Sequence, residues 1–292
     1  MIIEIVNNDI VLKNTDSFKL CDIFDCGQCF RFNRLENGDY IGTAFEKTIR
    51  ISQNEDTVVL HNTTAEDFEN VWYHFFDLDR DYSKIKQSLL KADDDVIRSA
   101  IEYGSGIRIL KQDLWETIIS FIISASNNIP RIKGIIERLC KEFGVPHEYE
   151  GNTYYSFPSA HTIAALDKEA LSSIRAGFRE KYILKCAQLV DSGEFDLDKL
   201  FTLSTADAKK ELMSLSGIGN KVSDCILLFA LGRFDSFPVD VWIKRIMEYC
   251  YFKNTEQTIP TISDFAKRYF GENGGIAQQY LFYYARSLHI GT

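Results

Sequence analysis

A lysine that follows a glycine-rich turn is the most chemically suggestive feature of the 292-residue sequence. Residues 215–221 read Leu-Ser-Gly-Ile-Gly-Asn-Lys and lie between two segments with helical periodicity. Gly217 and Gly219 allow a tight turn that exposes backbone amides at the start of the next helix, where they attract an anion. We therefore expect Gly217 and Gly219 to bind a phosphate, although a glycine pair also serves as an ordinary connection between helices.

Asp240 is the second candidate, because it precedes a helix that we expect to begin at Val241. An aspartate at this place is a good N-cap and needs no catalytic explanation. Lys221, however, offers an amine that in its neutral form is a nucleophile and can form a Schiff base. A carboxylate stabilises the positive charge that develops in such a reaction. The pair predicts covalent catalysis by Lys221 with Asp240 as its acidic partner, a chemistry that requires no metal or other cofactor.

The periodicity of the chain predicts the elements that position these residues. Alternating apolar residues predict strands at Ile2–Val6, Cys29–Phe32, Tyr40–Ala44, Thr48–Ser52 and Val58–His61. From Asp113 onward the spacing is helical, with later helices predicted at Asp167–Arg175, Lys181–Asp191, Thr205–Met213, Lys221–Leu231, Val241–Cys250 and Ile276–Leu288. We predict an α+β fold, in which an antiparallel β-sheet domain with helices, residues 1–104, packs on a mostly α-helical catalytic region, residues 105–292.

Composition and charge limit the functions that the chain can have. Hydrophobic residues make up 45% and charged residues 26%, as in ordinary globular proteins, and no apolar run reaches the roughly 18–20 residues of a membrane span. We therefore expect no membrane partner. The net charge of -9 opposes non-specific binding to phosphates, but Arg175, Arg179, Lys181 and Lys185 form a locally basic segment.

The seven cysteines are scattered, so we expect reduced thiols and no disulfide framework. Cys21, Cys26 and Cys29 have part of the spacing of an iron–sulfur site, but the next cysteine is the distant Cys140, which favours buried thiols. The N-terminus has no basic start followed by an apolar stretch, which predicts an intracellular protein.

The hairpin at 215–221, followed by Phe-Pro-Val-Asp at 237–240, resembles the helix-hairpin-helix, Gly/Pro-rich and Asp motif of DNA glycosylases. Residues 24–31, Phe-Asp-Cys-Gly-Gln-Cys-Phe-Arg, are similar to the N-terminal segment of the 8-oxoguanine branch, and the resemblance covers nearly the whole chain. It implies a helix-hairpin-helix glycosylase body, with the hairpin at about 205–250. It also implies a bifunctional glycosylase and abasic-site lyase that flips 8-oxoguanine from duplex DNA, displaces it with Lys221 and nicks the strand by β-elimination.

The resemblance further implies a pocket for the flipped base. The carbonyl of Gly27 would accept a hydrogen bond from N7–H of 8-oxoguanine, a donor that guanine lacks. Gln278 would meet the Watson–Crick edge of the base, Phe282 would stack on one face, and Cys225 would cover the other. Taken singly, Gly27 would be a bulge glycine, and Phe282 and Cys225 would be core residues.

Two further segments resemble the parts of the family that contact DNA around the lesion. Asn127, Asn128 and Arg131 match a loop that fills the gap in the duplex and reads the orphaned base. Phe178 matches a wedge that buckles the strand, and Arg179 a second reader of the orphaned base. By themselves these segments would be a capping loop and a core aromatic residue.

Three positions depart from the family pattern. The relatives carry Tyr in place of Phe178, His in place of Trp242 and a small residue in place of Pro130. These departures predict only a modest preference for cytosine opposite the lesion.

Two alternative functions stay open. The chain could be a related glycosylase with another lesion preference, or a helix-hairpin-helix module that binds DNA without catalysis. The missing C-terminal four-cysteine cluster argues against the endonuclease III branch, and Lys221 argues against the alkylbase branch. We expect a monomer whose partner is double-stranded DNA with a damaged base. It would be cytoplasmic and nucleoid-associated in a bacterium, or nuclear in a eukaryote.

Overall fold

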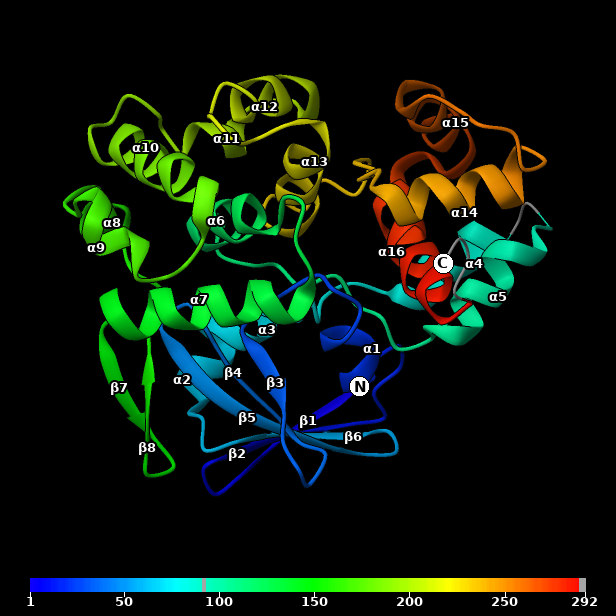
Figure 1. Cartoon of the computed structure of the whole chain (residues 1–292). Helices are drawn as coiled ribbons and strands as arrows, with labels where there is room; N and C mark the ends of the chain where they lie inside the picture. The colour runs from blue at the N-terminus through cyan, green and yellow to red at the C-terminus, as the bar shows by residue number, and fades with distance from the viewer. Residues whose placement is uncertain (91–92, 289–292) are drawn as a thin grey trace.

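The computed structural model describes residues 1–90 and 93–288, and its N-terminal part contains a six-stranded sheet (Figure 1). The strands are β1 (Ile2–Val6), β2 (Asp9–Lys13), β3 (Phe32–Arg34), β4 (Tyr40–Ala44), β5 (Lys47–Asn54) and β6 (Thr57–His61). Their spatial order is β1-β2-β6-β5-β4-β3, and every neighbouring pair is antiparallel.

Alternating apolar side chains build the core of this sheet. Ile10 and Leu12 of β2 pair in register with Leu60 and Val58 of β6, and all four side chains are fully buried. Because successive side chains of a strand point to opposite faces, these residues share one face of the sheet. That face packs against α1 (Leu20–Phe24) and against the aromatic side chains of Trp72, Phe75 and Phe76.

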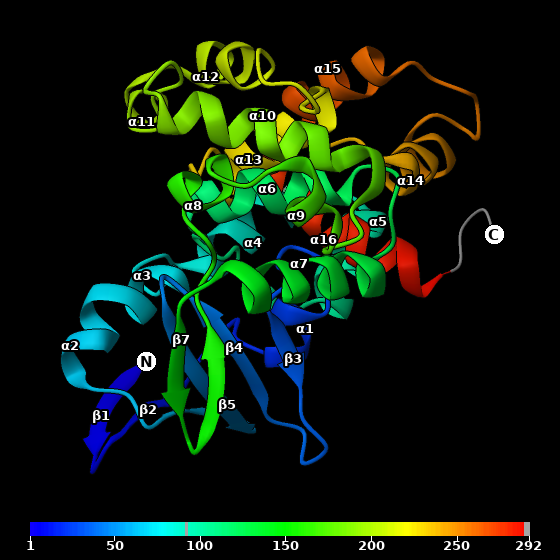
Figure 2. The same cartoon turned by 60° about the vertical axis from the view of Figure 1, so that its left-hand side comes forward.

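Helices dominate the chain after the sheet. They are α2 (Ala65–Asp67), α3 (Tyr73–Phe75), α4 (Tyr82–Leu90), α5 (Asp95–Tyr103), α6 (Leu114–Ser124), α7 (Ile129–Phe143), α8 (Ala160–Ala164), α9 (Lys168–Ser172), α10 (Glu180–Asp191), α11 (Lys199–Thr202), α12 (Thr205–Leu212), α13 (Asn220–Phe229), α14 (Val241–Tyr251), α15 (Ile259–Phe270) and α16 (Gly274–Ser287). Figures 1 and 2 show α7 between the sheet and the upper helices of the body. None of the helices that the structure describes has the length and apolar character needed to span a membrane.

The predicted α+β class, a sheet followed by a mostly helical body, is confirmed, but some predicted elements differ locally. β2 is absent from the predicted strands, and the strand predicted at Cys29–Phe32 begins only at Phe32. A second antiparallel sheet, β7 (Pro146–Tyr149) with β8 (Asn152–Tyr155), interrupts the region predicted to be helical. Its turn has Glu150 and Gly151 at positive φ, a backbone that suits the twist of a two-residue hairpin.

Arg108 connects its own loop to the loop between α3 and α4. Its side chain is buried and donates hydrogen bonds to the backbone carbonyls of Phe76, Asp77 and Arg80. Its guanidinium also lies 4.3 Å from the centre of the Tyr82 ring. A buried cation is tolerated only where such partners replace water, so Arg108 and these carbonyls stabilise the fold as a unit.

We expect Arg108→Met to lower the free energy of unfolding by about 3 kcal/mol or more, because buried carbonyls lose a charged donor. Urea unfolding followed by circular dichroism measures the change. Arg98→Met is the matched control, since Arg98 pairs with Asp93 and Asp95 at the surface and its loss should change stability little. Equal effects of the two substitutions would contradict the structural role of Arg108.

Candidate active site

The turn between α12 and α13 has the geometry of a hairpin that presents backbone amides. Gly217 has φ of +93°, and a Cβ at this position would lie 2.9 Å from the Cβ of Tyr182, so both conformation and space require glycine. Gly219 is the N-cap of α13 and offers no side chain to the first amides of the helix. These amides are therefore available to an anion at the helix start.

The hairpin opens on a pocket that combines all six residues predicted for catalysis and base binding. Gly27, Lys221, Cys225, Asp240, Gln278 and Phe282 line it together with Phe121, Phe229, Pro238 and Gln279. The residues come from the loop after α1 and from α6, α13, the segment before α14, and α16. Because these segments are far apart in the sequence, only the tertiary fold brings them together.

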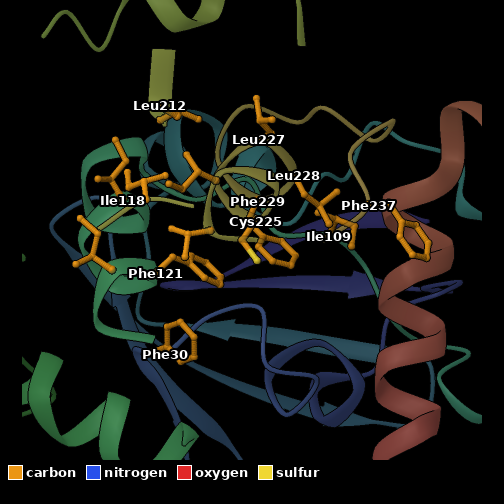
Figure 3. Close-up of a cluster of buried hydrophobic side chains, with 14 of the residues drawn as sticks. Phe30, Ile109, Ile118, Phe121, Leu212, Cys225, Leu227, Leu228, Phe229 and Phe237 are labelled. Atoms are coloured by element: carbon orange, nitrogen blue, oxygen red, sulfur yellow. The ribbon is translucent and has the colours of Figure 1, made fainter. Parts of the chain in front are cut away.

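Lys221 lies in the first turn of α13, next to two stacked aromatic rings. Its Nζ is 5.1 Å from the centre of the Phe121 ring, and Phe121 stacks on Phe229 with the ring centres 5.5 Å apart. Figure 3 shows Phe121, Cys225 and Phe229 next to one another in the buried cluster behind the pocket. The rings place the amine at the edge of an apolar wall, where few polar groups compete with a ligand for it.

Asp240 is the N-cap of α14, as predicted. Its Oδ1 accepts a hydrogen bond from the amide of Ile243 at 2.8 Å. Burial raises the pKa of the Asp240 carboxyl above its ordinary value of 3.8, while the amide of Ile243 and the charge of Lys221 act in the opposite direction. The carboxylate is thus fixed by the helix it caps and interacts electrostatically with Lys221.

Cys225 follows Lys221 by one helical turn and forms part of the pocket wall. Burial raises the pKa of its thiol to about 11, although the nearby Lys221 acts to lower it. At neutral pH the side chain is therefore a protonated thiol. A soft, uncharged group of this kind suits contact with an aromatic base.

Gly27 enters the pocket through its backbone. It has φ of +83°, and a Cβ here would lie 3.2 Å from Cε1 of Phe282 and 3.5 Å from Cδ1 of Ile129. A side chain would be strained and would also occupy the pocket. Glycine at this position lets the main chain itself form the wall.

Gln278 and Phe282 lie four residues apart on α16 and therefore share one face of the helix. Gln278 is 5% exposed, and its Oε1 has no hydrogen-bond partner among the residues that the structure describes. An unpartnered buried amide oxygen is costly, so a ligand with a matching donor would be stabilised there. Phe282 is only partly buried and offers a ring face beside it.

The segment between α6 and α7, together with the first turn of α7, presents three of the residues predicted to contact DNA. Asn128 is the N-cap of α7, with its Oδ1 accepting from the amide of Arg131 at 3.0 Å. Asn127 donates to the carbonyl of Ile123 at 3.1 Å and accepts from the amide of Asn128. Both asparagines thus shape the loop, and the side chain of Arg131 is exposed beside them.

Arg179, which was predicted to contact an orphaned base, is bound to the main chain in this structure. It is 2% exposed, and its guanidinium donates to the carbonyls of Ala125, Ser126 and Ala176. Its Cζ lies 4.3 Å from the centre of the Phe178 ring, which is 57% exposed. Because its donors are bound to the main chain, Arg179 holds loop 125–126 and the exposed ring of Phe178 in position and has little left to offer a base.

Four pocket residues were not among those predicted: Phe121, Phe229, Pro238 and Gln279. Phe121 and Phe229 follow the apolar spacing of their helices and so look like ordinary core residues in the sequence. Pro238 precedes Asp240 in the same short segment, and Gln279 adjoins Gln278, so adjacency was the one signal that could have identified them.

Two family models divide the chain between them. The 8-oxoguanine DNA glycosylase, N-terminal domain, matches residues 10–118, and the HhH-GPD superfamily base excision DNA repair protein matches residues 119–269. A probable N-glycosylase/DNA lyase of Methanothermobacter thermautotrophicus is 28% identical in an alignment of 248 residues that covers 78% of this chain and 77% of the relative.

Solved structures are similar over nearly the full length. The structure of MBOgg1 with a low-affinity DNA ligand is 45% identical, with a TM-score of 0.95 and coverage of 98% of each chain. The Clostridium acetobutylicum 8-oxoguanine glycosylase/lyase, in complex with double-stranded DNA containing cytosine opposite 8-oxoguanine, is 41% identical, with a TM-score of 0.95 and 99% of each chain covered. The chain therefore belongs to the 8-oxoguanine DNA glycosylase family of the helix-hairpin-helix superfamily.

Proposed function

We propose that this chain is a bifunctional DNA glycosylase and abasic-site lyase that excises 8-oxoguanine from duplex DNA. The observation that carries the proposal is that Lys221 and Asp240 line the same pocket as Gly27, Gln278 and Phe282. The pocket combines a nucleophile and an acidic partner with the backbone, amide and aromatic groups that an extruded base needs. The family membership supports the same reaction.

The reaction would begin when the neutral amine of Lys221 attacks C1′ of the flipped nucleotide. The C1′–N9 bond breaks, its electron pair leaves with the base, and the base takes up a proton. Asp240 would stabilise the positive charge on the sugar while this bond breaks. The nitrogen then loses a proton, and the C1′–O4′ bond breaks with its electron pair on O4′, which takes up a proton. The product is a Schiff base between Lys221 and C1′.

Strand cleavage would follow from the same intermediate. The Schiff base draws electrons from the sugar, so C2′ loses a proton and the 3′-phosphate leaves with the electron pair of the C3′–O bond. Water then hydrolyses the Schiff base and frees Lys221. The steps use only the amine, water and proton transfers, and none requires a metal or a nucleotide cofactor.

Base selection would depend on the Gly27 carbonyl. The proposed contact is a hydrogen bond from N7–H of 8-oxoguanine to this oxygen, whereas guanine would set its bare N7 acceptor against it. The unpartnered Oε1 of Gln278 would accept a hydrogen bond from a donor on the Watson–Crick edge of the base. Phe282 and Cys225 would cover the two faces of the base.

Duplex DNA with a damaged base is the proposed partner. Gly217 and Gly219 would present hairpin amides to a phosphate, Phe178 would enter the duplex as a wedge, and Asn127, Asn128 and Arg131 would face the orphaned base. We further propose that the enzyme acts as a single chain. It would work in the cytoplasm on the nucleoid of a bacterium, or in the nucleus of a eukaryote.

The lysine mechanism predicts that borohydride traps a covalent complex between the protein and a duplex with 8-oxoguanine. Lys221→Gln should form no adduct and should neither release the base nor nick the strand, because the amine is lost while the hairpin amides stay. Lys210→Gln, an exposed position on α12, should form the adduct like the unchanged protein. A denaturing gel measures all three.

Other outcomes of this experiment separate the alternatives. A protein that binds the duplex but gives no adduct and no base release would be a non-catalytic hairpin module. An adduct with another damaged base in a panel of duplexes, and none with 8-oxoguanine, would identify a related glycosylase with a different lesion preference.

Asp240→Asn should separate the charge of Asp240 from its cap. The asparagine oxygen can still accept from the Ile243 amide, so the melting temperature should change little while the single-turnover rate falls by a large factor. Asp240→Ala, the comparison variant, should also lose about 1 kcal/mol of stability with the cap. If Asp240→Asn unfolds or keeps full activity, the electrostatic role is wrong.

The pH dependence tests the same carboxyl. Because burial raises the pKa of Asp240 above 3.8, protonation removes its charge at a higher pH than for an exposed aspartate. The acid limb of the single-turnover rate should therefore lie above pH 3.8 and should be absent from the residual activity of Asp240→Asn.

Arg131 and Arg179 should respond differently to the base opposite the lesion. Arg131→Ala should slow excision opposite cytosine more than opposite adenine, since a good bidentate contact discriminates by roughly 1–3 kcal/mol. Arg179→Ala should slow both by similar factors, because it loosens loop 125–126. Single-turnover rates with both duplexes measure the ratio, and a selective loss in Arg179→Ala would restore the base-reading role first predicted for it.

A further inference from the structure

Loop 25–28 presents four consecutive carbonyls, and side chains from the helical body bind three of them. Arg286 donates to the carbonyl of Asp25 at 3.1 Å, and Gln279 donates to that of Cys26 at 2.8 Å. Gln112 donates to the carbonyl of Gln28 at 2.7 Å. In the part of the chain that the structure describes, the carbonyl of Gly27 accepts no hydrogen bond.

The buried side chain of Gln28 fixes the C-terminal end of the loop through hydrogen bonds. It is fully buried and donates to the carbonyls of Ile23 and Arg108, at 2.9 and 2.8 Å. Its Oε1 accepts from the amide of Leu110 at 2.9 Å. The residue after Gly27 is therefore held by its carbonyl and by both ends of its side-chain amide.

Gln279 binds the carbonyl of Cys26, the residue that precedes Gly27. It is 2% exposed, and its bond to the Cys26 carbonyl is buried. The peptide group of Cys26 precedes Gly27 directly, and glycine at φ of +83° has no Cβ to restrict rotation. Without the Gln279 donor, the peptide groups around Gly27 could turn to find another partner for the buried Cys26 carbonyl.

We propose that Gln279 is a positioning residue for lesion recognition: it binds the Cys26 carbonyl so that the Gly27 carbonyl alone remains free and points into the base pocket. Gln279 acts through the main chain, because its side-chain amide donates to the Cys26 carbonyl. The inference rests on the proposed function, because it assumes that the Gly27 carbonyl separates 8-oxoguanine from guanine.

The chain position of Gln279 gives the arrangement a further consequence. Gln278 precedes it on α16 and lines the same pocket, so one helix carries both the group proposed to read the Watson–Crick edge and the group that orients the Gly27 loop. Gln112, whose side chain binds the Gln28 carbonyl, also connects the loop to α13, because its backbone amide donates to the carbonyl of Phe229 at 2.8 Å. These bonds fix the position of loop 25–28 relative to α13, the helix that carries Lys221.

The test is the ratio of binding affinities for duplexes with 8-oxoguanine and with guanine, each opposite cytosine, in the Lys221→Gln background that prevents excision. Gln279→Met keeps the length of the side chain and removes its donor. The ratio should fall by about tenfold, the equivalent of one hydrogen bond of about 1.4 kcal/mol, mainly through weaker binding of the 8-oxoguanine duplex.

Gln279→Glu is the second variant, since it keeps the shape and carries the test if Gln279→Met fails to fold. Because burial favours the protonated acid, which still donates, the ratio should be retained where the acid is protonated and should fall as the pH rises and the side chain becomes a carboxylate without a donor. Gln53→Met is the matched control: Gln53 donates to the carbonyl of Phe18 at 2.7 Å and has no hydrogen bond to loop 25–28 among the described residues, so its loss should leave the ratio unchanged.

The outcomes distinguish the inference from the function on which it rests. If the Lys221→Gln protein with no second substitution binds both duplexes equally, the proposed lesion selectivity fails and this inference fails with it. If that protein discriminates, only the positioning role of Gln279 is overturned when Gln279→Met discriminates equally well, or when the ratio for Gln279→Glu does not change with pH. A loss of the ratio in Gln53→Met equal to that in Gln279→Met would also overturn it.

Discussion

The hydrogen bonds between loop 25–28 and the helical body are the interactions on which the arrangement of the pocket depends. Gly27 belongs to the N-terminal part of the chain, whereas Lys221 belongs to the hairpin and Gln278 to α16. Gln279 and Gln112 bind the carbonyls on either side of Gly27. Because hydrogen bonds are directional, they relate the loop to the body more sharply than apolar packing would. The enclosed site can then present a main-chain oxygen and an amine in one fixed relation.

The environment of Lys221 follows from the burial of α13. Residues Val222 to Phe229 of this helix are all buried, so only its first turn, with Gly219 and Lys221, faces the outside of the core. Because α13 is buried from Val222 onward, its first turn is the part of the helix that a ligand can reach. The exposed amides of that turn also attract an anion in a protein with a net charge of -9.

Arg179 shows how a charged residue can stabilise a functional surface without contacting the ligand. Its guanidinium holds the carbonyls of Ala125 and Ser126, and its plane supports the exposed ring of Phe178. Loop 125–126 leads directly to Asn127, Asn128 and α7. Burial of the cation against fixed carbonyls therefore connects the proposed wedge with the proposed opposite-strand loop.

The sequence alone determined the features that local chemistry dictates. Glycines at the hairpin, an aspartate before a helix and apolar periodicity predicted the turn, the cap at Asp240, the α+β class and the family. It also indicated six of the ten residues that line the pocket, because those six stand in motifs that resemble the family. The short strand β2 and the hairpin of β7 and β8 were missed, since pairing with a neighbour and a two-residue turn decide them more than composition does.

Only the tertiary structure decided which polar side chains are free and which are bound. Arg179 and Arg131 look equivalent in the sequence, yet one is buried against carbonyls and the other is exposed. Gln278 and Gln279 are neighbours of the same type, yet one keeps an unpartnered oxygen in the pocket and the other binds the Cys26 carbonyl. The physical reason is that a hydrogen-bond partner distant in the sequence leaves no local pattern, because its effect depends on distance and direction in space.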